Sequence, residues 1–259
     1  THLTRSVTIL RTPLRVVHCV QCRTVENKQT RKLRTHSLPP TVKLPHLLWA
    51  VLSMFGMGAG ALVGGLFLGL IVKSGSWIAF GVAVFGAVGG LGTLWFGLRH
   101  RMKWTLSELG FRTSARSLWH LLWWAPLTLL LSATASAVVG SLFEVAPGER
   151  SLDESIHLGI VPQIAVVFCS VLALPFLEEI FFRRALLDWL QRFTPVWVAG
   201  LISILAFSLA HVAPPLMIYT LFLGTSLTLA RFWFKTMKAP FLVHAFNNLV
   251  VSIVILVAM

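Results

Sequence analysis

Charged residues are scarce in this sequence. Lysine, arginine, aspartate and glutamate together make up 12% of its 259 residues, and only nine residues are acidic. A soluble globular domain carries about 25% charged residues, so the composition excludes an ordinary soluble domain. Hydrophobic residues make up 56% of the chain, and apolar stretches of about 20 residues recur, each long enough to cross the hydrocarbon core of a bilayer.

Strand-type alternation of apolar and polar residues is also lacking, which argues against a transmembrane barrel. The sequence therefore predicts an all-α fold, a polytopic transmembrane helical bundle of about seven spans. The expected spans are 46–72, 76–98, 117–140, 160–182, 195–212, 214–234 and 239–258.

Two hydrolase signatures are missing from the chain. It contains neither the HExxH pattern of zinc proteases nor the GxSxG turn of serine hydrolases. No serine within an apolar span lies beside a histidine in a recognisable pattern. If the protein hydrolyses a substrate, these absences favour an activated water as the nucleophile.

Cysteine is scarce too. Cys19 and Cys22 form a lone CxxC with two histidines nearby. A structural zinc site needs four well-spaced ligands, and no second CxxC follows. We therefore interpret this segment as tail rather than as a zinc site.

The net charge of +13 suggests nucleic acid at first, but its placement indicates membrane topology instead. Of the 22 lysines and arginines, all except Lys73 and Arg150 fall on one side of the expected spans. Such a bias marks the cytoplasmic side. We expect the N-terminus inside, the C-terminus outside, the lipid bilayer as a partner and no nucleic acid. The other side collects acids, namely Glu144, Glu149, Asp153 and Glu154.

Residues 1–45 are basic and lack the apolar run of 7–15 residues that a signal peptide requires. They are predicted to form a disordered cytoplasmic tail. In residues 46–140, small residues recur every four positions, which lets helix backbones approach closely. These are Gly56, Gly60 and Gly64 in the first span and Gly86 and Gly90 in the second.

Ionisable and amide side chains are concentrated in the apolar second half. They form three short patterns: Glu178-Glu179-x-x-x-Arg183, Phe207-x-x-x-His211 and His244-x-x-x-Asn248. A charged residue at the centre of a membrane helix costs about 2.5–3.5 kcal/mol. Each group alone has a structural explanation, but their convergence in about the last 80 positions indicates a shared functional site.

The spacing predicts how the acidic pair divides its roles. Glu179 and Arg183 are four residues apart, so they share one helix face and can pair. Neighbouring helical residues point about 100° apart, so we expect that Glu178 and Glu179 do not both face one substrate. Glu178 is then the freer carboxylate, available as a general base or a metal ligand.

The residue types permit two kinds of hydrolysis. In the first, Glu178 and His211 activate a water while His244 and Asn248 donate hydrogen bonds to the developing oxyanion. In the second, Glu178, His211 and His244 bind zinc, and the metal activates the water. Both alternatives stay open at this point.

Depth in the membrane adds a condition. His211 lies about 24 Å beyond Pro195 along its helix, whereas the expected limits of the fourth span place Glu178 near the inner end. The two groups can meet only if that helix continues to about Phe193. Pro175 is expected to loosen this helix before the acidic pair, and Pro214 and Pro215 to break the next helix after His211.

These motifs resemble the CPBP family, the intramembrane proteases of the CAAX prenyl protease and bacteriocin-processing type, also called the abortive-infection family. The resemblance covers roughly 104–259 and is carried by three motifs in order. These are Glu178-Glu179-Ile-Phe-Phe-Arg183, Phe207-Ser-Leu-Ala-His211 and His244-Ala-Phe-Asn-Asn248.

The resemblance implies an intramembrane endopeptidase. It implies that Glu178 and His211 activate water, that His244 and Asn248 form the oxyanion site, and that Glu179 and Arg183 complete the motif. Zinc held by Glu178, His211 and His244 and a metal-free mechanism are equally open. The chain would then consist of the tail 1–45, accessory transmembrane helices in 46–140 and a protease core in 155–259.

The implied substrate is a membrane-associated peptide or protein, either prenylated and CAAX-like or of the bacteriocin type. The implied location is the cell membrane, as a multi-pass protein, and the short loops favour a bacterial plasma membrane. Two alternatives remain: a non-proteolytic bacteriocin-immunity or scaffold protein of the same fold, and a proton-coupled transporter, since Glu/His chains also relay protons.

Overall fold

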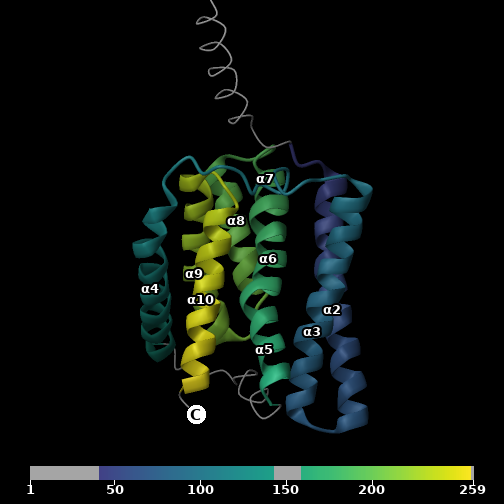
Figure 1. Cartoon of the computed structure of the whole chain (residues 1–259). Coiled ribbons are helices and arrows are strands. Elements are labelled where there is room, and N and C mark those ends of the chain that lie inside the picture. Colours follow the sequence, from purple (N-terminus) through teal and green to yellow (C-terminus); the bar gives the residue numbers. More distant parts are fainter. Residues whose placement is uncertain (1–40, 143–158, 258–259) are drawn as a thin grey trace, which may run out of the picture. The chain divides into compact units, whose positions relative to one another are not determined.

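The computed structural model describes residues 41–142 and 159–257, and within these residues every regular element is a helix (Figure 1). The predicted tail lies almost wholly outside the described residues, as do Cys19, Cys22 and the acidic stretch 144–154. The helices are α2 Leu44–Val72, α3 Gly75–Leu94, η1 Trp95–Arg101, η2 Leu118–His120, α4 Leu121–Leu142, α5 Ile160–Phe168, η4 Cys169–Ala173, α6 Leu174–Glu179, η5 Ile180–Leu186, α7 Leu187–Leu190, α8 Val196–Leu209, α9 Pro214–Phe234 and α10 Lys238–Val257.

The prediction of about seven spans agrees with the structure. Several of these helices run on without a break, so that the described residues contain six helices long and apolar enough to cross a membrane. The seventh, α8, is apolar but has only 14 residues, which is short for a span of about 20. The orientation of the N-terminus stays a prediction.

The helices carry their apolar side chains outward. Phe55 in α2 is 70% exposed and Leu70 is 76% exposed, whereas Ser53 of the same helix is fully buried. This distribution is the reverse of that in a water-soluble helix, and it fits a surface that contacts lipid. The polar side chains accordingly gather between the helices, where they find hydrogen-bond partners.

The α2 and α3 helices form a tightly packed antiparallel pair, as the glycine spacing predicted. A Cβ atom added at Gly60 or Gly64 would overlap backbone atoms of α3, and one at Gly86 would press against Ala61 of α2. Gly90 faces Leu177 in α6 as well, so these small residues also let the pair approach the helix that carries the acidic motif.

We expect Gly60→Ala to lower the free energy of unfolding by about 1–3 kcal/mol, because the added methyl overlaps the Phe85 carbonyl. The matched control is Gly58→Ala, where nothing lies within 4 Å of the added Cβ. That change is expected to be neutral or to stabilise by about 0.5–1 kcal/mol, since alanine is the better helix former. Denaturant titration in micelles measures both, and equal effects would contradict the packing interpretation.

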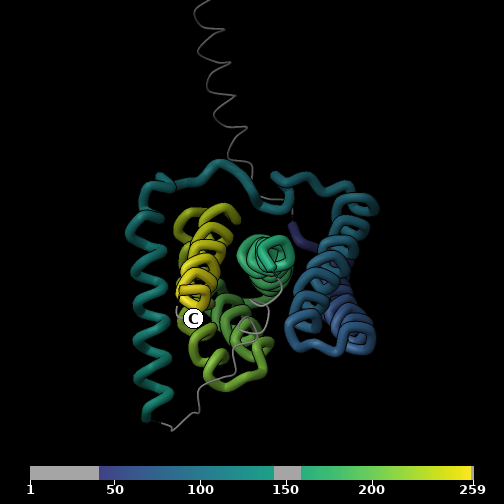
Figure 2. Tube along the Cα trace, turned by 60° about the horizontal axis from the view of Figure 1, so that its bottom comes forward, coloured from purple at the N-terminus to yellow at the C-terminus, as the bar shows by residue number. Residues whose placement is uncertain are grey.

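Residues 160–190 form one uninterrupted run, the central helix (Ile160–Leu190). It contacts α2 and α3 on one side and α8 and α10 on the other (Figure 2). Pro175 lies at the start of α6 directly after the π-helical turn η4, and a second π-helical segment, η5, follows Glu179. The predicted loosening before the acidic pair is therefore present, and π turns often accompany functional sites.

Because this helix continues past the acidic pair, it meets the requirement that Glu178 and His211 lie at similar depths in the membrane. It ends at Leu190, close to the predicted Phe193, so Glu178 lies about 18 Å along the helix from that end. His211 lies about 22 Å from the start of α8, which begins on the same side. The two residues therefore reach similar depths.

The connector between η1 and η2 packs against the central helix. Phe111 stacks on Phe176 with ring centroids 5.5 Å apart. Its turn is capped by Thr105 and Glu108. The Thr105 backbone N–H donates to the Glu108 carboxylate at 2.6 Å and thereby holds the pKa of Glu108 below its usual range. Gly110 ends the turn with φ of 95°, a conformation that favours glycine.

Candidate functional site

The predicted Glu179–Arg183 pair lies at the centre of the molecule. Arg183 Nη1 donates to Glu179 Oε1 at 3.0 Å, and neither side chain is exposed. Arg183 Nη2 also donates to the carbonyl of Gly224 in α9 at 3.3 Å. A fully buried ion pair persists only when both charges have partners, so this pair ties the central helix to α9.

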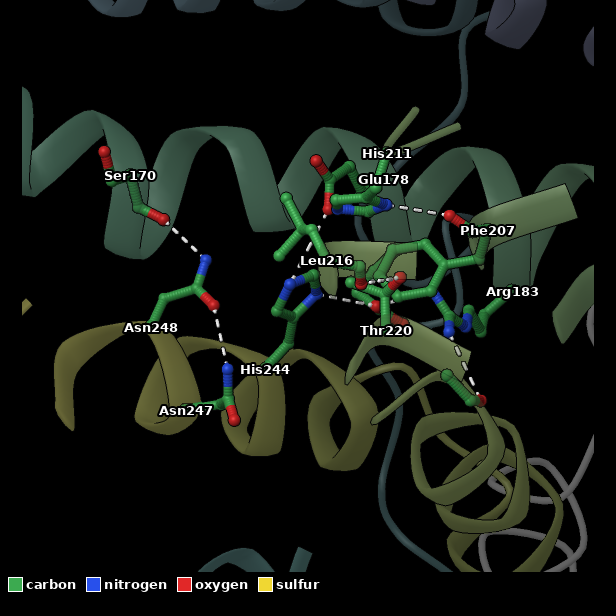
Figure 3. Close-up of polar contacts among 12 residues, drawn as sticks. Ser170, Glu178, Arg183, Phe207, His211, Leu216, Thr220, His244, Asn247 and Asn248 are labelled. Carbon is green, nitrogen blue, oxygen red and sulfur yellow. Dashed lines mark hydrogen bonds and ion pairs between the residues drawn. The ribbon is translucent and has the colours of Figure 1, made fainter. Parts of the chain in front are cut away.

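His244 of α10 lies between the two adjacent glutamates, and Figure 3 shows its contact with Glu178. Its Nδ1 is 3.0 Å from Glu179 Oε1, and its Nε2 is 3.6 Å from Glu178 Oε2. That the two carboxylates do not both face one substrate stays a prediction. They do point apart by about 100°, but an imidazole placed between them contacts one carboxylate with each nitrogen.

Glu178 is the freer carboxylate, as expected from the spacing. Its side chain is 19% exposed, and within the described residues its polar contact is with His244. At 3.6 Å this contact is too long for a hydrogen bond. The separation leaves the carboxylate able to accept a proton or a hydrogen bond from a bound molecule.

Both histidines and the arginine pack against the ring of Phe207. Its ring centroid is 4.9 Å from that of His211, 5.7 Å from that of His244, and 4.1 Å from the Arg183 guanidinium carbon. The Phe207 side chain is fully buried. The three motifs, which lie far apart in the sequence, therefore meet at this ring.

The conformation of His211 fixes its tautomer. Its Nδ1 is 2.8 Å from the backbone carbonyl of Phe207, and a carbonyl can only accept, so Nδ1 carries the hydrogen. In the neutral ring Nε2 is then the acceptor. The chain breaks here as predicted: Val212 has a φ of 56°, and α9 begins at Pro214.

The side-chain amide of Asn248 is part of a series of hydrogen bonds and does not face an open cavity. Its Nδ2 donates to the carbonyl of Ser170 in η4 at 2.9 Å, and its Oδ1 accepts from Asn247. Asn247 in turn accepts from the Tyr219 hydroxyl at 2.6 Å. An amide nitrogen carries two hydrogens, so Asn248 keeps one N–H for a ligand.

A metal site requires several ligand side chains gathered around one point. Among the described residues, no group of three or more His, Cys, Asp or Glu side chains is arranged to hold a metal ion. The Nε2 atom of His211 is open to a ligand, since its Nδ1 is engaged by the Phe207 carbonyl. The predicted set of Glu178, His211 and His244 has the residue types of a catalytic zinc site, and both the zinc site and the metal-free alternative stay predictions.

A second buried charge cluster was missed from the sequence. Asp188 accepts from Arg184 at 2.7 Å and from Arg231 at 3.0 Å. Both arginines are buried within helices, although the charge count assigned them to inner loops. The four-residue spacing of Arg184 and Asp188 was the available signal. Because Arg184 also donates to the Glu108 carbonyl, this cluster fastens the connector and α9 to the central helix.

Tyr219 and Ser170, which contact the two asparagines, were also not identified from the sequence, since isolated polar residues carry no motif.

These features define a multi-pass membrane protein with a buried cluster of glutamate, arginine and histidine at the meeting point of three helices. Residues 160–250 match the family model described as Rce1-like, Type II CAAX prenyl endopeptidase Rce1-like. This match confirms the resemblance for that part of the chain and supports a peptidase. No curated protein and no solved structure gives a significant match.

Proposed function

We propose that this protein is an intramembrane endopeptidase that cleaves a membrane-associated substrate, a prenylated CAAX-type peptide or protein, with a water activated by Glu178 and His211. The observation that carries the proposal is the convergence of two carboxylates, two imidazoles and one guanidinium around Phe207, inside the region that matches the peptidase family. A bacteriocin-type substrate and a bacterial plasma membrane stay predictions.

The proposed reaction begins with a water between Glu178 and His211. The carboxylate takes a proton as the water oxygen attacks the scissile carbonyl carbon. The lone pair on His211 Nε2 accepts a hydrogen bond from the same water, and the Phe207 carbonyl keeps this nitrogen free. The carbonyl π electrons move to oxygen and form a tetrahedral oxyanion.

The oxyanion is proposed to receive hydrogen bonds from His244 and Asn248. Glu179 orients His244 through Nδ1, and in the imidazolium form His244 also carries a hydrogen on Nε2. Its Nε2–H and the second N–H of Asn248 then serve as donors. Collapse of the intermediate breaks the C–N bond, and the leaving amine takes the proton from Glu178.

Two buried atoms support a site that receives a ligand. Glu179 Oε2 and Arg183 Nε have no hydrogen-bond partner among the described residues. Buried polar groups without a partner are rare in folded proteins. A bound water or a substrate amide beside the pair would supply the missing partners.

The test is mass spectrometry of the reconstituted protein incubated with a farnesylated CAAX peptide. We expect loss of the last three residues, and we expect the activity to persist with a zinc chelator because no group of three ligand side chains is gathered among the described residues. Loss of activity with the chelator and its return with added zinc would overturn the metal-free mechanism. Absence of cleavage for prenylated and unprenylated peptides alike would overturn the endopeptidase and favour the immunity or scaffold alternative.

A further inference from the structure

A second binding feature lies away from the candidate active site, between α4 and α10, which run side by side (Figure 2). A groove of about 750 Å³ opens there, within the range of about 300–1,000 Å³ typical of sites for small ligands. Its walls are apolar and include Leu122 and Pro126 of α4 and Leu242 and Phe246 of α10.

One end of the groove is basic. Arg116 and Lys238 line it together with the hydroxyl-bearing Thr113, Ser114 and Ser117, and no acidic residue lines the groove. Trp119 stands at the same end and is 77% exposed. Exposed tryptophan next to an apolar span marks the level of the lipid headgroups, so the two cations lie where a lipid phosphate would.

The other end runs along the helices toward the bilayer interior. From Leu118 to Pro126 and from Lys238 to Phe246, each wall extends about 12 Å. Leu122 is 70% exposed and Leu242 is 45% exposed, so the groove is open sideways. An acyl chain can therefore enter it from the membrane without passing through the protein.

The groove is separate from the peptidase site. Leu242 and Phe246 lie two residues before and after His244, which turns them about 200° from it around α10. His244 is buried toward the central helix, whereas Leu242 faces outward. The substrate of the proposed endopeptidase has to reach His244, so this outer groove fits a different occupant.

We propose that the groove binds an anionic glycerophospholipid of the surrounding membrane. Its phosphate contacts Arg116 and Lys238, and an acyl chain lies along Leu122, Pro126, Leu242 and Phe246. Basic pockets between transmembrane helices have the chemistry that recognises such headgroups. The bound lipid would brace α4 against α10, and this inference does not depend on the protein being a peptidase.

Native mass spectrometry of the full-length protein in micelles, with phosphatidylglycerol or phosphatidylcholine added, tests the proposal. We expect selective retention of phosphatidylglycerol by the wild type. The double variant Arg116→Gln/Lys238→Gln should retain it about 30-fold less, since each basic residue near a membrane surface contributes about 1 kcal/mol. The matched control Arg99→Gln/Lys235→Gln removes the same charge from exposed residues outside the groove and should bind as the wild type does.

A second variant addresses the acyl chain and covers the case in which the charge variant fails to fold. Leu242→Trp fills the groove from a lipid-facing position and should also lower retention. Equal loss in both charge variants would overturn the proposal in favour of diffuse surface charge. Competition by inorganic phosphate alone would reduce the site to an ion site, and displacement by a farnesylated peptide would assign the groove to the substrate.

Discussion

Replacing Glu178 by glutamine is expected to lower the rate of peptide cleavage by a factor of about 10²–10⁴, the range typical of a lost general base. The side chains have nearly the same shape, but the amide cannot take the proton of the attacking water. Because the polar contact of Glu178 within the described residues is the long one with His244, the change leaves no buried partner there without a hydrogen bond. We therefore expect kcat to fall while KM and thermal stability stay close to wild type.

The matched control is Glu108→Gln, which changes a half-buried carboxylate in the connector. Its cleavage rate should equal that of the wild type, since glutamine still provides an oxygen for the turn. His211→Gln should also be slow, and the double variant with Glu178→Gln should be little slower than either single variant, because residues that act on one water are not additive. Full activity of Glu178→Gln would contradict its role as the base.

The second large effect is expected for Arg183→Met, which should lower the free energy of unfolding by about 3–5 kcal/mol. The change leaves the fully buried Glu179 carboxylate without its guanidinium partner. It also removes the guanidinium from the face of Phe207 and from the Gly224 carbonyl. Denaturant titration in micelles, followed by circular dichroism, measures the loss.

The double variant Glu179→Gln/Arg183→Met separates charge from packing. With both charges removed, no uncompensated ion stays buried, and most of the stability should return. Arg99→Met is the control at an exposed arginine and should change stability by less than about 0.5 kcal/mol. A single variant as stable as the double would contradict the buried ion pair as the cause.

Several features of the fold follow from local sequence alone. The apolar runs fixed the helical class, and the four-residue glycine spacing identified the close α2–α3 packing. The depth of His211 required a fourth helix that continues past the acidic pair, and the helix indeed continues to Leu190. In each case the deciding quantity is a period or a length, which a sequence states directly.

Other features could not be obtained in this way. The roles assigned to Asn248 assumed an open oxyanion site, whereas the amide also contacts Ser170, 78 positions earlier in the chain. The 100° rule for neighbouring glutamates describes one helix correctly but says nothing of an imidazole that α10 inserts between them. The Asp188 cluster joins two helices and a connector. The sequence shows only one of its contacts, the pair of Arg184 and Asp188, which are four residues apart on the same helix.

The sequence by itself therefore determined which residues are helical and which helix face each occupies. It also identified the polar side chains whose free-energy cost in a membrane indicates a function. Only the tertiary structure decided that His244 reaches both glutamates and that Phe207 gathers the three motifs. The physical reason is that helical periodicity fixes the direction of a side chain relative to its own axis. The partner it meets depends on how helices distant in the sequence pack, and that packing is a property of the whole set of side chains between them.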